Sequence, residues 1–244
     1  MNAMENTETK QSARIQTSLL NPSEKVILRA LARRIPLFVT SDHLTAIGVV
    51  GAVIVLVGYA LTTYSPAWLW LANAGFFINW FGDSLDGTLA RFRNQQRPLY
   101  GFYIDHNLDC VCAFLMVLGA GMSAYMSLTV ALLIIVPYFM LDVFVMINAH
   151  LKNEFQLTFA KLGPTELRLI IILVNACFFF IPTLQTWSYT FSLFGHNHTL
   201  LALDFAALFI SLNLFVIYFH SLWQDTHYYA HIDPLHKSTP THSE

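Results

Sequence analysis

Charged side chains are scarce in this chain of 244 residues, of which only 11% are Asp, Glu, Lys or Arg and 55% are hydrophobic. Soluble globular domains carry roughly a quarter of charged residues. The mean hydropathy of +0.52 also favours a membrane protein. The formal net charge is only -2, so the chain lacks the basic field that nucleic-acid binding requires, and we exclude nucleic acid as a partner.

Cysteine and a leader segment are lacking as well. The three cysteines, Cys110, Cys112 and Cys177, lie in apolar runs without zinc-site spacing, which predicts small buried hydrophobes. The first 20 residues are polar and have no apolar core of a signal peptide. We expect a disordered N-terminal tail over residues 1–22, one membrane domain over residues 23–222 and a polar C-terminal tail over residues 223–244.

Long apolar runs, by contrast, are frequent. A membrane-spanning helix needs about 20 mostly apolar residues. Six segments meet this need, at residues 44–63, 66–86, 103–124, 128–149, 166–186 and 200–222. Residues 23–35 add a segment in which Val26, Leu28, Leu31 and Ile35 alternate with basic residues, which predicts an amphipathic helix on the membrane surface. The fold class is therefore all-α, with six transmembrane helices and an N-terminal amphipathic surface helix.

The basic residues predict the orientation. All 13 Lys and Arg residues lie before the first span, after the last, or in and beside the connections between spans two and three and spans four and five. The alternate connections contain none. Because Lys and Arg favour cytoplasmic loops, both termini are expected in the cytoplasm, and we expect a multi-pass protein of a bacterial inner membrane.

Four aspartates stand out against this apolar background. Asp83 and Asp86 are three residues apart at the end of the second span, and Asp105 and Asp109 are four residues apart at the start of the third. Both spacings place a pair on one face of a helix. Since the two spans are joined by a short connection, the four carboxylates are expected to converge at the cytoplasmic side.

Four converging carboxylates imply bound cations. Carboxylate oxygens are hard ligands that suit Mg²⁺, Mn²⁺ or Ca²⁺. Two such ions can hold a pyrophosphate and stabilise phosphoryl transfer. Nearby, Gly87 and Ala90 leave room for a ligand beside the helix, and Arg91 adds a cation suited to phosphate.

The segment around these residues resembles the signature of the CDP-alcohol phosphatidyltransferase family, D-x2-D-G-x2-A-R-x8-G-x3-D-x3-D. Every fixed position is filled, by Asp83, Asp86, Gly87, Ala90, Arg91, Gly101, Asp105 and Asp109. The chain departs from the pattern in one place, since nine residues and not eight separate Arg91 from Gly101. The extra residue falls in a loop, where an insertion is tolerated.

The resemblance implies a role for each of these residues. Asp83, Asp86 and Asp105 would bind two divalent ions, Mg²⁺ or Mn²⁺, and Asp109 would contact one ion and act as general base. The nucleotide of a CDP-activated donor would be held by Asp83, Gly87, Ala90 and Arg91. An acceptor hydroxyl would attack the β-phosphate, and CMP would leave. The donor would be CDP-diacylglycerol with a small polar acceptor, or a CDP-linked head group with a diacylglycerol acceptor.

Other polar residues leave alternatives open. His106 completes a D-H-x-x-D pattern similar to the ethanolamine and choline phosphotransferase branch, where it would help activate the hydroxyl, but a structural histidine fits equally well. Arg168 would bind a phosphate of the acceptor or of the lipid donor, or reach the membrane interface. Asp142 would make an interhelical hydrogen bond or line an acceptor site.

Further expectations concern the outer end, the segment before the first span, and assembly. Asp204, near the external end of the last span, is expected to be solvated. Ser41 and Asp42 stand where the family's S-P-N-x-L-T stretch has proline and asparagine, and Thr45 would border the nucleotide. The resemblance also implies a homodimer, for which residues 178–180 or the aromatic stripe of the second span would supply a packing face, although lipid contact explains these residues equally well.

A divalent-cation transporter or channel with an acidic site is the alternative from another class. It explains the aspartates. It leaves the spacing of Gly87, Ala90 and Arg91 unexplained, as well as the gathering of all four carboxylates at one membrane face.

Overall fold

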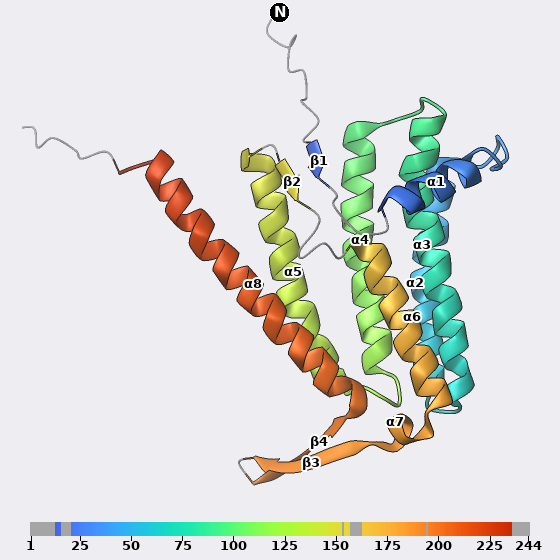
Figure 1. Ribbon diagram of the computed structural model, residues 1–244, viewed down its shortest axis with the longest axis vertical. Helices are drawn as coiled ribbons and strands as arrows, with labels where there is room; N and C mark the ends of the chain where they lie inside the picture. Colours follow the sequence, from blue (N-terminus) through green and yellow to red (C-terminus); the bar gives the residue numbers. More distant parts are fainter. Residues whose placement is uncertain (1–12, 16–20, 153, 157–162, 194, 236–244) are drawn as a thin grey trace, which may run out of the picture.

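The computed structural model describes residues 13–15, 21–152, 154–156, 163–193 and 195–235, and it is predominantly helical, as the sequence predicts (Figure 1). The long helices follow the apolar runs. The helices are α1 (Asn21–Ala32), α2 (Ser41–Leu61), α3 (Leu69–Phe92), α4 (Pro98–Gly121), α5 (Leu128–Lys152), α6 (Pro164–Phe180), α7 (Pro182–Thr186) and α8 (Ala202–Ile232), with a 3-10 turn at Pro66–Trp68.

Two short pairs of strands accompany the helices. β1 (Ala13–Ile15) pairs in parallel with β2 (Glu154–Gln156), and β3 (Ser188–Leu193) pairs antiparallel with β4 (His196–Leu201). β1 falls within the segment expected to be a disordered tail. The β3–β4 hairpin occupies a connection where the sequence analysis expects only a loop.

Each of the six predicted spans occurs as a helix, and α2, α4, α5 and α8 are long and apolar enough to cross a membrane. The other two predicted spans do not meet that standard within the described residues. α3 carries Asp83, Asp86 and Arg91 in its second half, and α6 has only 17 residues. The chain is thus an integral membrane protein with four spans defined by length and composition, and a count of six is not confirmed.

Several helix ends differ from the predicted spans, since α3 continues past residue 86 to Phe92 and α4 begins before residue 103, at Pro98. The fifth was expected to reach residue 186, but α6 ends at Phe180, because Pro182 has no N–H to continue the helix and begins the separate α7. The sixth was expected to end at residue 222, but α8 continues to Ile232 and so includes ten residues of the predicted C-terminal tail. Residues 236–244 of that tail, and most of the N-terminal one, lie outside the described residues.

α2 and α3 pack with their backbones in direct contact. A Cβ added to Gly51 would lie 2.4 Å from the backbone nitrogen of Asn79, and one added to Gly82 would lie 2.4 Å from that of Gly48. Real Cβ atoms do not approach backbone this closely, so only glycine permits the observed separation. The glycines therefore fix the position of α3, which carries two of the four aspartates, against α2.

A buried chain of hydrogen bonds ties α6 to the same pair. The Tyr59 hydroxyl donates to Asn175 Oδ1 at 3.0 Å, and Asn175 Nδ2 donates to Asn73 Oδ1 at 2.8 Å. Asn73 in turn donates to the carbonyl of Ile172 at 3.3 Å. Because all these partners are satisfied, the polar groups hold the three helices in register at little desolvation cost.

α1 is anchored to the end of the bundle that carries the aspartates. Its residues Leu28 and Ala32 are buried in a cluster with Leu44, Leu85 and Leu89. Glu24 Oε1 accepts hydrogen bonds from Trp80 Nε1 and from Thr165 Oγ1, both at 2.8 Å. A helix therefore occupies this segment, and one of its faces packs on α3, whereas its predicted place on the membrane surface is not confirmed.

Asp204 contradicts the sequence expectation. It is fully buried, and its carboxylate accepts hydrogen bonds from the backbone N–H groups of Ser127 and Leu201, each at 2.8 Å. The prediction of a solvated side chain was wrong because Asp204 lies in the first turn of α8, where the N–H groups at the helix start need an acceptor. The residue is a structural cap.

Figure 1 shows how these parts are arranged. α2, α3, α4 and α6 form one group, and α5 packs with α8 and leans away from that group. α1 lies at one end of the bundle, and the β3–β4 hairpin lies across the opposite end.

Candidate active site

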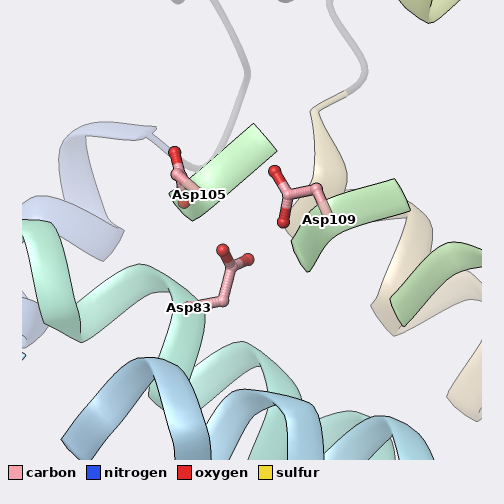
Figure 2. Close-up of side chains that lie close together, drawn as sticks. All are labelled: Asp83, Asp105 and Asp109. Carbon is pink, nitrogen blue, oxygen red and sulfur yellow. The ribbon is translucent and has the colours of Figure 1, made fainter. Parts of the chain in front are cut away.

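Three of the four predicted carboxylates converge (Figure 2). Asp83 comes from α3, and Asp105 and Asp109 come from the first turns of α4. One carboxylate oxygen of each lies within 4.8 Å of the others. The residue spacings predicted this meeting, since Asp105 and Asp109 share a helix face that turns toward Asp83.

Asp86 lies beside this group but is held differently. Its side chain is only 9% exposed, and its Oδ2 accepts a hydrogen bond from Thr45 Oγ1 at 2.6 Å. The other oxygen accepts the backbone N–H of Gly87. Asp86 therefore stands outside the group of three, although all four aspartates line one pocket together with Thr45, Gly48 and Asn79.

The stretch before α2 reaches this pocket in spite of its departures from the family pattern. Ser41, in place of the pattern's proline, donates its hydroxyl to the backbone carbonyl of Asp86 at 3.0 Å. Together with the bond from Thr45, this contact attaches the start of α2 to the end of α3. The structural role of Ser41 is not visible in the sequence, because only the fold places it opposite Asp86.

The donor set fits divalent cations. Three carboxylate oxygens this close repel one another unless positive charge lies between them or protons are retained. Oxygen donors of this kind suit Mg²⁺ and Mn²⁺. Among the described residues, Asn79 Oδ1 is also a buried oxygen without a hydrogen-bond partner, and its residue lines the same pocket. The pocket thus offers hard oxygen donors in excess of what the protein itself satisfies.

One cation is supplied by the protein. Arg168 Nη2 on α6 lies 2.7 Å from Asp83 Oδ2, and both side chains are mostly shielded from solvent. The sequence analysis expected Arg168 to bind a phosphate or to reach the membrane interface. The structure brings it into contact with the carboxylate cluster. Asn175, buried on α6, supports this contact because it fixes that helix on α3.

The residues expected to hold the nucleotide follow Asp83 along α3. The guanidinium of Arg91 lies over Gly87, where an added Cβ would come within 3.3 Å of Nη1. Arg91 also donates to Thr88 Oγ1 at 3.3 Å. Gly87 therefore leaves space for the arginine as well as for a ligand, and Ala90, on the same turn, is half-buried.

His106 lies between the two aspartates of α4 in sequence. Its Nδ1 is 2.8 Å from the backbone carbonyl of Phe102, and the two rings are in contact with centroids 4.1 Å apart. This contact assigns the proton to Nδ1, which leaves Nε2 as the nitrogen able to accept a proton. The contact is also what a structural histidine would make, so both alternatives stand.

Arg93 is a residue that sequence reasoning missed. Its guanidinium donates to three backbone carbonyls of the α1–α2 connection, those of Ile35, Pro36 and Val39, at 3.0, 2.9 and 2.5 Å. Its position beside the family signature was the only available signal. The contacts hold the α1–α2 connection against the end of α3.

Arg97 makes a second link across this end of the protein. It donates to both oxygens of Asp42 at 2.7 and 2.6 Å and lies over the ring of Tyr100. The hydrogen bond that Arg97 donates to Asp42 raises the pKa of Arg97 above its ordinary value. The pair closes the loop that carries the extra residue onto the start of α2.

Asp142 contacts a cysteine on the neighbouring helix. Cys110 Sγ donates to Asp142 Oδ2 at 3.3 Å, which joins α4 to α5. This is the interhelical hydrogen bond expected as one of its two alternatives. Asp142 is not part of the group of three carboxylates.

Comparisons with known proteins agree with the geometry. Residues 38–221 match the model of the CDP-alcohol phosphatidyltransferase family. The chain is 29% identical over 165 residues to human cholinephosphotransferase 1, which covers 64% of this chain and 40% of the human protein. It is 28% identical to the bovine cholinephosphotransferase 1, over 71% of this chain and 44% of that protein.

A shorter bacterial protein matches over a smaller region. Phosphatidylinositol phosphate synthase of Cutibacterium acnes is 34% identical over 91 residues, 37% of this chain and 38% of that protein. The chain therefore spans only about two fifths of the length of the cholinephosphotransferases that it matches, 40% in the human case.

Proposed function

Because the chain belongs to the CDP-alcohol phosphatidyltransferase family, we propose that it transfers a substituted phosphate group from a CDP-activated donor to an acceptor hydroxyl in phospholipid synthesis, with release of CMP. The observation that carries this proposal is the convergence of Asp83, Asp105 and Asp109 within 4.8 Å in a pocket that Asp86 also lines. Phosphoryl transfer depends on positioning and on neutralising charge, and this pocket is built for both.

The aspartates divide the chemistry between them. Asp83, Asp86 and Asp105 would hold two Mg²⁺ or Mn²⁺ ions, with Asp109 touching one of them. When bound, these ions neutralise the pyrophosphate and stabilise the developing charge. Asp109 would accept the proton of the acceptor hydroxyl while the hydroxyl oxygen forms a bond to the β-phosphorus. The bond from that phosphorus to the bridging oxygen breaks, and the electron pair leaves with CMP.

Gly87, Ala90 and Arg91, with Asp83, would bind the cytidine nucleotide. They follow one another along α3 directly after the first metal ligand, so a pyrophosphate held at Asp83 would place the nucleoside beside Gly87. Thr45 and Ser41 would support this arrangement from α2 by keeping Asp86 in place. His106 would assist proton transfer through Nε2.

Arg168 would take part through its charge. In contact with Asp83, it lowers the negative charge that the pocket presents to a cation, and its guanidinium is close enough to the cluster to reach a phosphate of the donor or the acceptor. The chain offers few other basic residues here, which favours an acceptor without a phosphate. The similarity to cholinephosphotransferases supports a CDP-linked head group as donor and a lipid hydroxyl as acceptor.

For the membrane arrangement we propose six spans over a domain of residues 23–222, with both termini and the active site in the cytoplasm of a bacterium. The distribution of Lys and Arg supports this arrangement. In the same frame α1 would rest on the cytoplasmic membrane surface, since Val26 and Ile27 remain exposed on the side away from α3.

A homodimer stays part of the proposal, with a changed packing face. Phe178 is only 5% exposed and belongs to the core of the protomer, whereas Phe180 is 69% exposed. Of the two, only Phe180 can contact a second copy. Cross-linking of the reconstituted protein tests this point.

The central experiment measures thermal stability of the purified protein with CDP or CMP, with and without Mg²⁺ or Mn²⁺. A ligand that binds only the folded protein raises its stability. We expect stabilisation by the nucleotide that depends on the metal and is lost in Asp83→Ala. Stabilisation by metal that is indifferent to nucleotide would contradict the proposal and favour the cation-transporter alternative.

A further inference from the structure

The β3–β4 hairpin has two chemically different faces. Its antiparallel register pairs Phe191 with His198 and Tyr189 with Leu200, so these four side chains share one face. The opposite face carries hydroxyl and amide side chains, namely Ser188, Thr190, Ser192, Asn197 and Thr199, with Leu201 opposite Ser188 where β4 ends. Thr190 and Thr199 are joined on that face by a hydroxyl contact of 3.0 Å. The hairpin is therefore amphipathic, with alternating aromatic and polar residues.

The aromatic face is only partly covered within the described protein, where Phe191 and Leu200 are half-buried. Tyr189 is 55% exposed, and His198 is exposed as well. Both strands are edge strands, and residues 169–203 contain no Asp, Glu, Lys or Arg. A two-stranded ribbon is marginally stable alone in water, and an uncharged, exposed edge invites aggregation. Something therefore covers this face in the native setting.

The hairpin lies at the level where the helices end. It connects the end of α6, through α7, to the start of α8, and it runs across that end of the bundle (Figure 1). Trp187 precedes β3 on the same alternation as Tyr189, and its ring packs on Phe205 in the first turn of α8, with centroids 5.1 Å apart. Trp187 thus attaches the base of the hairpin to the start of α8.

Exposed aromatic residues gather around the same level. Trp70, at the start of α3, contacts Phe179 and Phe180 at the end of α6, with ring centroids 5.7 and 6.2 Å apart. Trp68 and Trp70 are 40% and 46% exposed. Trp and Tyr concentrate at the boundary between the hydrocarbon core and water. Tyr189 and Trp187 continue this belt.

From this arrangement we propose that the β3–β4 hairpin lies flat in the interfacial layer of the bilayer, with Tyr189, Phe191 and His198 among the lipid head groups and the serine and threonine face in water. The unpaired edges of the hairpin limit how deeply it can enter the bilayer, because backbone N–H and C=O groups without partners are not tolerated in the hydrocarbon core. The placement also accounts for the short α6, whose 17 residues span roughly 25 Å, somewhat less than the core of a typical bilayer.

Two neighbouring positions on opposite faces provide the test. Phe191→Cys and Thr190→Cys are each labelled with an environment-sensitive fluorophore and reconstituted into phosphatidylcholine vesicles. The unsubstituted protein, labelled in parallel, gives the background from its own cysteines. Quenching is measured with iodide on both sides of the membrane, and with lipids that carry a nitroxide near the head group or deep in the acyl chain.

We expect the label at position 191 to be quenched about two-fold more by the shallow nitroxide than by the deep one, and the label at position 190 to respond mainly to iodide. Equal iodide quenching at both positions would overturn the proposal, as would a label at position 191 that no lipid quenches. If a cysteine variant fails to fold, Trp187→Phe gives a second measurement. The difference in emission between the unsubstituted protein and this variant is the emission of Trp187, and lipids brominated near the head group should quench it. A Trp187 emission that these lipids do not quench would equally overturn the proposal.

Discussion

At the end of the bundle that carries the aspartates, charged side chains reach across the protein: Arg93 binds the α1–α2 connection, and Arg168 contacts Asp83. At the hairpin end, no Asp, Glu, Lys or Arg occurs between Arg168 and Asp204, and Asp204 itself is buried as a helix cap. One end therefore gathers its charges around the pocket that we propose binds the donor, whereas the other presents aromatic and hydroxyl groups. The following changes would break or sharpen this comparison.

The largest effect is expected for Asp109→Asn, which removes the proposed general base from the aspartate end. Transfer should fall by about 10²- to 10⁴-fold, whereas the stabilisation by CDP and metal should remain. Activity assays and thermal shifts on the same preparation check this. Asp142→Asn is the matched control, since Asp142 lies on the neighbouring helix outside the cluster. A variant of Asp109 with full activity would remove the base assignment.

Asp86→Ala should abolish binding of metal and nucleotide together. Asp86 lines the pocket and also joins α2 to α3 through Thr45. Calorimetric titration with Mn²⁺, followed by CDP, measures both. Thr45→Val breaks only the supporting hydrogen bond and should weaken binding without abolishing it. If Asp86→Ala bound both ligands as well as the natural protein, Asp86 would not belong to the metal site.

His106→Ala separates the two interpretations of that histidine. A loss of transfer on the order of 10²-fold is expected if Nε2 assists proton transfer. Asn107→Ala is the matched control, because Asn107 makes the equivalent contact to the carbonyl of Tyr103 one turn earlier, at 2.6 Å. Equal, small losses in both variants would make His106 structural.

Asp204→Ala tests the one carboxylate of the hairpin end. Two backbone N–H groups would lose a charged acceptor, so we expect the free energy of unfolding to fall by ~2–4 kcal/mol, with transfer per folded molecule unchanged. Asp204→Asn keeps one acceptor and should cost less. Thermal unfolding in detergent gives the comparison, and a variant as stable as the natural protein would show that the cap is dispensable.

Arg97→Gln should have the smallest effect. Its pair with Asp42 is half-exposed on both sides, and such surface pairs contribute little. We expect no measurable change in Tm at physiological salt. A clear loss of stability or of nucleotide binding would show that the loop between α3 and α4 needs this link.

The sequence predicted those parts of the molecule that follow from a long apolar run or from a regular spacing of residues. Apolar runs located the long helices, and the spacing of the aspartates predicted the convergence of Asp83, Asp105 and Asp109. The alternation of Trp187, Tyr189 and Phe191 with small polar residues was a strand signal too, but its length and its place between two spans favoured a loop. Contacts that depend on distant packing, such as those of Arg93 and the bond from Ser127 to Asp204, leave no local pattern.

The glycine contacts between α2 and α3 have a mechanical consequence. Because the backbones of these two helices touch at the glycines, the helices cannot easily shift against each other. Thr45, Asp83 and Asp86 are therefore held as one unit. α4 packs closely on α2 at its C-terminal end, where a Cβ added to Gly119 would lie 2.6 Å from the backbone of Leu56. At its N-terminal end, nothing lies within 4 Å of a Cβ added to Gly101. We therefore expect α4 to pivot at Gly119. Its movement would shift Asp105 and Asp109 relative to Asp83 and Asp86 and so open the pocket to the donor.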